Sequence, residues 1–470
     1  MSQTLFFYDL ETSGLNSRSG RIMQFAGQRT DMDLKPLGQP VNLLVKLSDD
    51  ILPDPGAIMV TGITPQKTVE EGYSEPEFCK FLDQEVFTPG TVTIGYNNVR
   101  FDDEFIRHTM WRNFYDPYEW AWSDERSRWD VLDVVRLVRA LRPDGINWPV
   151  NADGKPVNKL EMIAKANNLT HTRAHDALSD VEVLIDLTRL IKTKQPKMFD
   201  YLFNLRNKKA VSKLVGLDEP KAFVYASGRY DDRFEKTTVA YPISLGSKPN
   251  SLLVYDLRYD PTPFAKATPR ALSEVMFASK EQRADPSFVR LPVKELTINK
   301  CPAVAPLGVL DDDAQKRISL KLDTIKKNLD KLVKLPDFGD RVREAYEMRE
   351  PYPEANDVEA KLYDSFTPDQ DKPRLSAIRA ASADELADFH PNFADERLGE
   401  LLLRYKARSF PTSLSQAEQE AWDEYRQNKL AAQVEPYMKS LAVQAEKGGD
   451  SFLIDELRLW VESILPVEVD

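Results

Sequence analysis

The stretch Leu5-Phe6-Phe7-Tyr8-Asp9-Leu10-Glu11-Thr12 decides the fold, because an apolar run ends in two acidic residues spaced two apart. Residues two apart in a strand point to the same face, so Asp9 and Glu11 project together while Leu10 faces the opposite way. Neighbouring carboxylates repel each other unless a cation lies between them, and magnesium prefers carboxylate oxygens as ligands. The stretch therefore predicts a first strand that carries half of a metal site. Taken alone, such a pair at a strand end is more often a solvated loop.

Three further polar residues follow in order along the chain. The apolar run Thr91-Val92-Thr93-Ile94-Gly95-Tyr96 predicts a strand, and Asp102 opens a helix-like pattern shortly after it. Within Ala174-His175-Asp176-Ala177-Leu178-Ser179-Asp180-Val181, a polar stretch leads into an apolar-periodic helix. His175 lies just before that helix or at its cap, and Asp180 lies about one turn inside it. All of these side chains can face one cleft.

This constellation resembles the DEDD superfamily of 3′→5′ exonucleases, histidine subtype, with Asp9, Glu11, Asp102, His175 and Asp180 at its five motif positions. Segments outside the motif resemble the bacterial exodeoxyribonuclease I family. They are Ile58 to Gln66, Gly95 to Asp103, Asn113 to Tyr118, Gly145 to Pro149, Asn299-Lys300-Cys301-Pro302 and Tyr405 to Pro411. The likeness covers essentially the whole chain, which makes it more specific than the short motifs alone.

Residue patterns and the resemblance together predict the fold class and three domains. Residues 1 to about 195 alternate strand-like and helix-like segments, as in an α/β ribonuclease-H-like exonuclease domain. Residues 196–350 contain short strand-like runs, including Thr237–Ile243 and Phe288–Leu291, and the family carries an SH3-like β-rich domain there. Residues 351–470 are mostly helical in pattern, which predicts an α-helical C-terminal domain.

Composition excludes several classes of protein. The chain has 470 residues, 42% of them hydrophobic, a net charge of −12 and two distant cysteines, Cys79 and Cys301. The N-terminus does not read as a signal peptide, and no apolar stretch approaches the ~20 residues that span a bilayer. We therefore expect a cytoplasmic protein with two reduced thiols and no membrane contact. The acidic charge argues against a general polyanion binder but leaves room for a local basic groove.

One region combines arginines with aromatic residues in a way that is typical of single-strand binding. No lysine occurs between Gln84 and Lys155, whereas eight arginines and several aromatic residues do. Arginine grips phosphates, and exposed aromatic faces stack on unpaired bases at ~1–3 kcal/mol each. Most of these side chains are expected to be core or surface ion pairs. A minority is predicted to line the groove, namely Arg107, Tyr118, Trp122 and Arg136.

The resemblance implies how the five motif residues act. Asp9, Glu11, Asp102 and Asp180 are expected to bind two magnesium ions, which manganese is expected to be able to replace, with Asp102 acting directly or through water. His175 can take a proton from the attacking water near neutral pH. Leu10, Glu11, Thr12 and the residues around Ser13-Gly14 are predicted to receive the terminal nucleotide. Lys159 is predicted to contact a substrate phosphate, and an ion pair with Glu161 is an equally good explanation for it.

Two positions have a competitor in the sequence. Asp103 is next to Asp102, and only one of them belongs in the site; Asp102 is favoured because it directly follows Phe101, as in the family. His171 competes with His175, which has the five-residue spacing to Asp180. Each residue by itself could be ordinary packing or surface, whereas a chance origin of all five together is not plausible.

The family also docks the acidic, Phe-ending tail of single-stranded-DNA-binding protein in a basic pocket. Arg142, Tyr201 and Lys221 lie where that pocket would receive contributions. Acid at Asp311-Asp312-Asp313, where the family favours a basic residue, weakens this prediction.

The leading hypothesis is a monomeric, processive, magnesium-dependent 3′→5′ exonuclease that acts on single-stranded DNA and releases 5′-mononucleotides in repair and recombination. A proofreading or RNA-trimming exonuclease is the enzyme alternative, although such proteins usually need only about 200 residues. A non-catalytic single-strand binder is the alternative from another class. It would have no use for four carboxylates that repel phosphate when no metal is bound.

Overall fold

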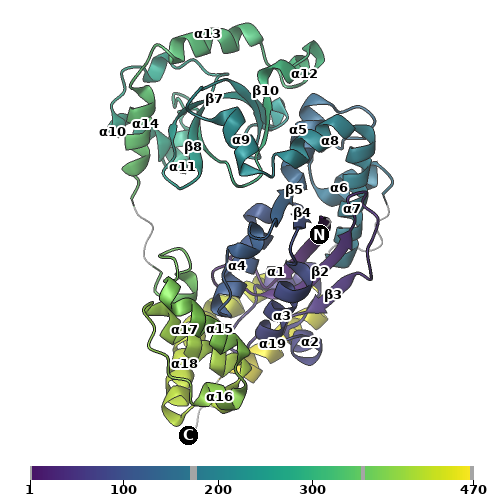
Figure 1. Cartoon of the computed structure of the whole chain (residues 1–470), viewed down its shortest axis with the longest axis vertical. Helices are drawn as coiled ribbons and strands as arrows, with labels where there is room; N and C mark the ends of the chain where they lie inside the picture. The colour runs from purple at the N-terminus through teal and green to yellow at the C-terminus, as the bar shows by residue number, and fades with distance from the viewer. Residues whose placement is uncertain (1–2, 170–176, 351–354, 466–470) are drawn as a thin grey trace. The chain divides into compact units, whose positions relative to one another are not determined.

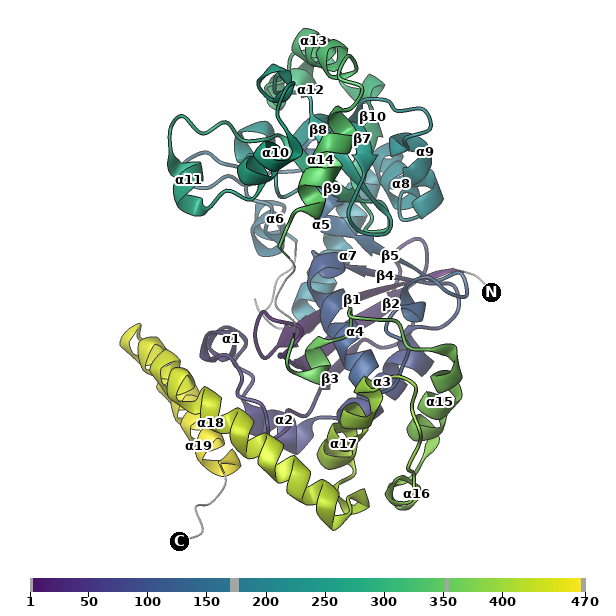
Figure 2. The same ribbon diagram turned by 90° about the vertical axis from the view of Figure 1, so that its left-hand side faces the viewer.

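The computed structural model describes residues 3–169, 177–350 and 355–465. Its chain divides into two compact units, one made of residues 1–127, 172–182 and 354–470 and the other of residues 128–171 and 183–353. In the first unit, the N-terminal part is therefore packed together with the C-terminal end of the chain. Figures 1 and 2 show the elements of both units.

A mixed sheet forms the centre of the first unit. Its strands are β1 (Thr4–Thr12), β2 (Ile22–Thr30), β3 (Val41–Leu44) and β4 (Thr91–Gly95). They are ordered β3-β2-β1-β4 within a five-stranded sheet whose last strand, β5 (Ser127–Asp130), leads out of this unit. β1 runs antiparallel to β2 and parallel to β4, with Phe7 opposite Gln28 and Ile94. β1 is thus an inner strand with a neighbour on each side.

Four helices of the first unit precede or follow these strands in sequence. They are α1 (Pro55–Thr61), α2 (Pro65–Glu71), α3 (Glu75–Phe81), which continues as a π-helical turn (Leu82–Val86), and α4 (Asp102–Arg112). Each of α1, α2 and α3 has a side-chain N-cap and a proline in its first turn, features that start a helix at a defined residue. Phe25 and Tyr8 of the sheet pack with Phe78 of α3 and Phe105 of α4 in one buried cluster.

The C-terminal helices complete the first unit. They are α15 (Lys372–Ala380), α16 (Ala383–Ala387), α17 (Arg397–Ser409), α18 (Gln416–Glu446) and α19 (Ser451–Ile464). Figure 2 shows α18 and α19 lying side by side. Both helices pack on Ile58 of α1, and Trp111 and Phe114 at the end of α4 pack against α15 and α17. These buried contacts hold the helical end of the chain against the sheet part.

A second five-stranded sheet forms the centre of the second unit. All of its strand pairs are antiparallel, and its order is β10-β6-β7-β8-β9. The strands are β6 (Phe223–Ala226), β7 (Thr237–Leu245), β8 (Ser251–Asp256), β9 (Val293–Thr297) and β10 (Ala303–Pro306).

Nine α-helices of this unit precede, separate or follow these strands along the described part of the chain. They are α5 (Val131–Leu141), α6 (Leu160–Ala166), α8 (Pro196–Asn204), α9 (Lys208–Val215), α10 (Pro269–Met276), α11 (Lys280–Ala284), α12 (Asp312–Arg317), α13 (Leu322–Leu332) and α14 (Phe338–Glu347). Helix α7 (Ala177–Lys194) begins in the first unit and ends in the second.

The predicted alternation of strands and helices in the first 195 residues, the short strands in the middle and the helical end all agree with this fold. The strand predicted at Phe288–Leu291 is wrong, because these residues adopt no regular structure. Val289 is 56% exposed, and Pro292 follows directly. An apolar side chain that faces water contributes no burial, and a proline removes a backbone donor that a sheet would need.

Candidate metal and nucleic-acid site

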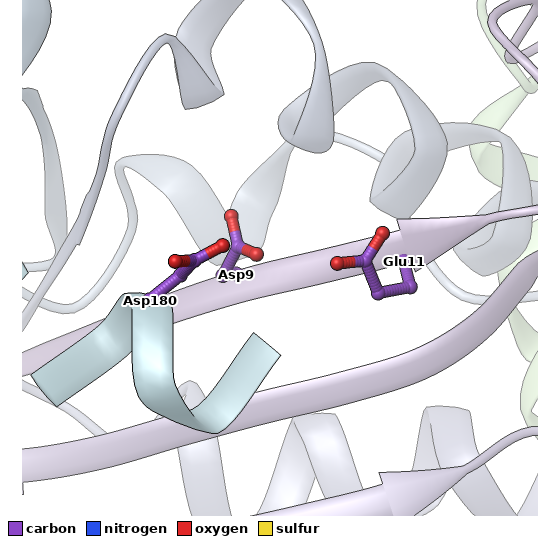
Figure 3. A group of neighbouring side chains, drawn as sticks. All are labelled: Asp9, Glu11 and Asp180. Atoms are coloured by element: carbon purple, nitrogen blue, oxygen red, sulfur yellow. The ribbon is translucent and has the colours of Figure 1, made fainter. Parts of the chain in front are cut away.

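Three carboxylates meet where β1 ends and α7 begins. Asp9, Glu11 and Asp180 each offer one carboxylate oxygen, and these oxygens all lie within 4.8 Å of one another. Figure 3 shows Asp9 and Glu11 on the same side of β1, with Asp180 reaching toward them from the first turn of its helix. β1 extends past the apolar run and continues to Thr12, so both acidic residues lie within the strand. The sequence prediction of a shared face for Asp9 and Glu11 agrees with this geometry.

The electrostatics of this group indicate crowding of negative charge. Withdrawal from water raises the pKa of Asp9 well above its ordinary value, and the charges of Asp102, Glu11 and Asp180 raise it further. A divalent cation would remove this repulsion and favour the ionised carboxylates. The donor set consists of oxygens alone, which fits a hard ion such as magnesium. The residues present therefore fit the ions that the sequence predicts.

Asp102 and Asp103 lie at the start of α4 and have different surroundings. Asp103 is fully buried and accepts hydrogen bonds from the hydroxyl of Tyr8 and from the Asn98 side chain. The charge of Asp102 raises the pKa of Asp9, so Asp102 is the member of the pair whose charge acts on the acidic group. This difference supports the choice of Asp102. His175, like its competitor His171, lies outside the described residues.

The residues predicted to receive the terminal nucleotide lie within the acidic pair and just beyond it. The side chain of Leu10 is 5% exposed and packs in the core on the opposite face of β1, so it does not reach the carboxylates. Because neighbouring side chains of a strand point to opposite faces, only the backbone of Leu10 lies beside the acidic pair. The Thr12 hydroxyl donates to the Gly14 carbonyl oxygen at 2.9 Å. Next to these residues is a hollow of about 410 Å³, lined by the 13–20 loop, residues 51–55 and α18.

An aromatic and cationic cluster lies at the other end of α4 and in the C-terminal part of the same unit. Arg107 pairs with Glu104 at 2.8 Å, and its guanidinium carbon lies 5.8 Å from the Tyr118 ring centre. Tyr118 contacts Tyr363 and Phe366 with ring centres 6.4 and 5.7 Å apart. Phe366 is 81% exposed, which leaves one aromatic face of this cluster in water.

The sequence analysis did not single out Phe366 or Tyr363. Phe366 lies in Asp364-Ser365-Phe366-Thr367-Pro368, where an aromatic residue stands alone among loop-forming residues. An aromatic residue in such a polar, turn-forming segment has no apolar neighbours in sequence with which to form a core. Its expected exposure was the signal that could have identified Phe366. Of the predicted residues, Trp122 agrees with this pattern because it is 66% exposed.

Two other predicted DNA contacts lie in the second unit. Arg136 is mostly buried, pairs with Asp133 at 2.5 Å and packs against Gly228. These contacts favour a structural role for Arg136 over a role in phosphate binding. Lys159 precedes α6, is exposed and lies 3.8 Å from a carboxylate oxygen of Glu161. Such a long, solvated pair is weak, so the lysine remains available to a phosphate.

The predicted partner pocket coincides in part with a hollow in the second unit. A concavity of about 920 Å³ is lined by α8, α9, α13 and the segments around residues 220–222 and 306–307, and both Tyr201 and Lys221 belong to its wall. Arg142 is not among its lining residues; it pairs with Asp311 at 3.1 Å and donates to the Val309 carbonyl oxygen at 2.9 Å. Asp311, whose negative charge weakens the prediction of a basic pocket, therefore forms an ion pair with Arg142, one of the residues predicted to contribute to that pocket.

No helix among the described residues is both long and apolar enough to cross a bilayer.

Comparison with known proteins extends over the whole chain. Family models match in three consecutive blocks: an exonuclease domain over residues 6–188, the SH3-like domain of exonuclease I over 206–348 and the C-terminal domain of exonuclease I over 356–464. The three matches confirm the predicted fold class of an α/β exonuclease domain, an SH3-like domain and a helical C-terminal domain.

Relatives of known sequence and structure are similar along their full length. The exodeoxyribonuclease I of Haemophilus influenzae is 38% identical over 449 residues, which are 95% of each chain. A crystal structure of Escherichia coli exonuclease I in complex with a dA16 oligonucleotide has 36% identity and a TM-score of 0.95, covering 99% of this chain and 100% of that one. A zinc-bound form of the Escherichia coli complex with single-stranded DNA has a TM-score of 0.94 at 35% identity and the same coverage.

Proposed function

Because this chain belongs to the exodeoxyribonuclease I family, a family of hydrolytic exonucleases, we propose that it removes 5′-mononucleotides from the 3′ end of single-stranded DNA in a magnesium-dependent reaction. One observation carries the proposal: the carboxylates of Asp9, Glu11 and Asp180 converge within 4.8 Å on an inner strand and the start of a helix. The solved relatives in complex with single-stranded oligonucleotides support the choice of substrate. A role in DNA repair and recombination is the corresponding cellular proposal.

The acidic residues hold the metal ions in this proposal. Asp9, Glu11 and Asp180 bind them directly, and Asp102 completes the site directly or through water. Two magnesium ions, when bound, activate a water molecule, relieve the charge on the phosphate and stabilise the leaving 3′-oxygen. Zinc in a solved relative supports divalent-cation binding in this family, and manganese is expected to be able to replace magnesium.

The remaining residues position the strand and move a proton. His175 accepts a proton from the attacking water, since an imidazole is partly neutral near pH 7. The backbone of Leu10 and the Thr12–Gly14 turn contact the terminal nucleotide, and the hollow of about 410 Å³ beside them gives it room. Tyr118, Phe366 and Trp122 stack on upstream bases. Arg107 is buried and paired with Glu104, as Arg136 is with Asp133, so its part is to support the Tyr118 ring rather than to bind a phosphate directly. Aromatic faces stack on any base, which fits an enzyme that moves along a strand.

Docking of a protein partner is a second part of the proposal. The hollow that contains Tyr201 and Lys221 has an apolar wall with Leu307 and Val333 and two lysines, Lys213 and Lys221. An acidic tail that ends in an aromatic residue matches this combination of apolar surface and positive charge. We propose the tail of single-stranded-DNA-binding protein as the occupant. Loss of tail affinity in Lys221→Ala would support this assignment, and unchanged binding would remove Lys221 from it.

The decisive experiment compares matched 5′-labelled single-stranded DNA, duplex DNA and RNA, with magnesium or with EDTA. The wild type is expected to shorten only the single-stranded DNA, from its 3′ end, and only when magnesium is present. Asp180→Asn is expected to lose this activity. Asp186→Asn, the same change further along α7, serves as the matched control and should retain it. Equal attack on RNA would favour an RNA-trimming enzyme, and DNA binding without cleavage would contradict the active-site assignment.

A further inference from the structure

A small cavity in the first unit has a wall dominated by positive charge. Its volume is about 40 Å³, and Arg21, Lys46, Arg112 and Arg408 line it together with a single carboxylate, Glu75. The residues come from the start of β2, the segment after β3, the end of α4 and the end of α17. The wall therefore joins the sheet part of the unit to its C-terminal helices.

Carboxylates pair with the buried arginines of this wall. Glu75 pairs with Arg112 at 2.6 Å, Glu359 pairs with Arg21 at 2.5 Å, and Asp50 pairs with Arg408 at 2.7 Å. Buried charges are costly unless they are paired, and these three pairs balance the three arginines. The exposed Lys46 adds a fourth positive charge at the rim of the cavity.

Two of the arginines keep an unused donor. Nε of Arg21 and Nη1 of Arg112 are buried and have no hydrogen-bond partner among the described residues. Both side chains are only 3% exposed. In contrast, all three guanidinium nitrogens of Arg408 donate to Asp50 or Glu359. An unused donor on a buried guanidinium group is costly, because the group has lost its bonds to water. Four other arginines of the described residues also keep a buried unused donor, but Arg21 and Arg112 are the two that line this cavity.

Neighbouring groups respond to the same positive field. Burial lowers the pKa of Arg21, and the charges of Arg112 and Arg408 lower it further. Burial also lowers the pKa of His108 to about 4, with Arg112 as the next cause. Burial would lower the pKa of Arg112 and of Arg408 as well, but Glu75 raises the pKa of Arg112, and Asp50 and Glu359 raise that of Arg408, so both guanidinium groups stay charged beside the cavity.

We propose that this cavity, with Arg21, Lys46 and Arg112 as donors, binds a small tetrahedral oxyanion of the inorganic phosphate or sulfate class. Planar guanidinium groups are suited to such oxygens because they offer several N–H donors in a fixed plane. The cavity exceeds the space of one water molecule, which needs roughly 10–15 Å³, but it is too small for a nucleotide. The bound anion ties the 13–21 loop, which leaves the acidic strand β1, to the C-terminal helices.

Thermal unfolding of the full chain in EDTA tests the binding. EDTA removes metal from the Asp9 group, so phosphate cannot bind there through a cation. Sodium phosphate is compared with sodium chloride at equal ionic strength, and a saturated site should raise the melting temperature by about 2–5 °C more than chloride does. A phosphate effect equal to the chloride effect would overturn the proposal.

Charge reversal at the rim of the cavity gives a variant that should fold normally. Lys46 is exposed, so Lys46→Glu removes one donor without disturbing buried packing. It is expected to abolish most of the phosphate-specific shift, whereas Lys67→Glu, an equally exposed lysine that does not line the cavity, should retain it. A full shift in Lys46→Glu would overturn the assignment.

Selenate, a tetrahedral oxyanion with an anomalous scatterer, can locate the site in crystals of the wild type. A selenium peak between Arg21, Lys46 and Arg112 is expected. Peaks elsewhere only, in crystals that are saturated with selenate, would contradict the proposal even if phosphate stabilised the protein.

Discussion

The hydroxyl of Tyr8 on β1 donates a hydrogen bond to the carboxylate of Asp103 on α4, although the two residues are 95 positions apart. Burial raises the pKa of Tyr8 well above its ordinary value, with the charge of Asp103 as the next cause, so the phenol stays protonated and can donate. This bond fixes the start of α4 against the strand that carries Asp9. The neighbouring Asp102 then acts on the acidic group while Asp103 serves the fold.

Replacing Asp102 should therefore reduce activity, whereas replacing Asp103 should reduce stability. Asp102→Asn is expected to reduce the rate of nucleotide release by at least about 100-fold, because a charged group of the metal site is lost, with little effect on the free energy of unfolding. Asp103→Asn is expected to lower that free energy by about 1–3 kcal/mol, since it weakens a buried hydrogen bond. Urea unfolding and a nuclease assay on both variants separate the effects. A reversed pattern would exchange the roles of the two residues.

The convergence of Asp9, Glu11 and Asp180 predicts a stability that depends on metal. In EDTA the three carboxylates repel one another, so magnesium should raise the melting temperature of the wild type by mass action on the folded state. Asp180→Asn should show a smaller magnesium shift and an unchanged or higher melting temperature in EDTA. Asp186→Asn, further along the same helix, should respond to magnesium like wild type. An equal magnesium shift in Asp180→Asn would contradict the assigned ligand.

Much of the site could be predicted from sequence because local pattern determines it. Period-two spacing places Asp9 and Glu11 on one face of β1, and the helical pattern after Ser179 places Asp180 in a first turn. The surroundings of Arg136 could not be predicted in this way. Its partner Asp133 is one helical turn away, but Gly228, which closes over it, lies in a distant segment.

Phe366 shows the same limit for nucleic-acid contacts. Its exposure and its contact with Tyr118 arise from packing between α4 and a segment some 250 residues later, which no periodicity encodes. The end of β1 depends on pairing with another strand in the same way. Polar Asp9 and Glu11 end the apolar run, yet pairing with β2 through Thr12 continues the ladder.

Exposed Phe366 and its neighbour Tyr118 should contribute to DNA affinity and not to chemistry. Phe366→Ala is expected to weaken binding of single-stranded DNA by about 5- to 150-fold, which corresponds to one lost stacking contact of ~1–3 kcal/mol. The turnover rate at saturating DNA should stay near that of wild type. Phe452→Ala, a 65% exposed phenylalanine in α19 outside this cluster, is the matched control and should bind normally. Equal affinity in both variants would exclude Phe366 from the DNA path.

The ion pairs of Asp50 should make the stability of the first unit depend on pH in the acid range. Burial alone would raise the pKa of this carboxyl group, but the charges of Arg408 and Lys429 outweigh burial and hold the pKa well below its ordinary value. A carboxyl group whose pKa is lower in the folded state contributes stability that is present above its unfolded-state pKa, near 3.9, and lost as the pH falls toward the folded-state value. Its contribution should therefore be complete at pH 5–7 and decline below about pH 4.

Replacing Asp50 tests this dependence. Asp50→Asn removes the buried charge that pairs with Lys429 and with two nitrogens of Arg408, so it should lower the free energy of unfolding at pH 7 by about 3–5 kcal/mol. The deficit relative to wild type should shrink as the pH falls below about 4, because the wild type then loses the same charge. Asp49→Asn, whose carboxylate is half exposed and 3.3 Å from Arg426, should cost at most about 1 kcal/mol at any pH. Urea unfolding across this range measures both variants, and a deficit for Asp50→Asn that stays constant down to the acid limit would show that lost packing, not lost charge, accounts for it.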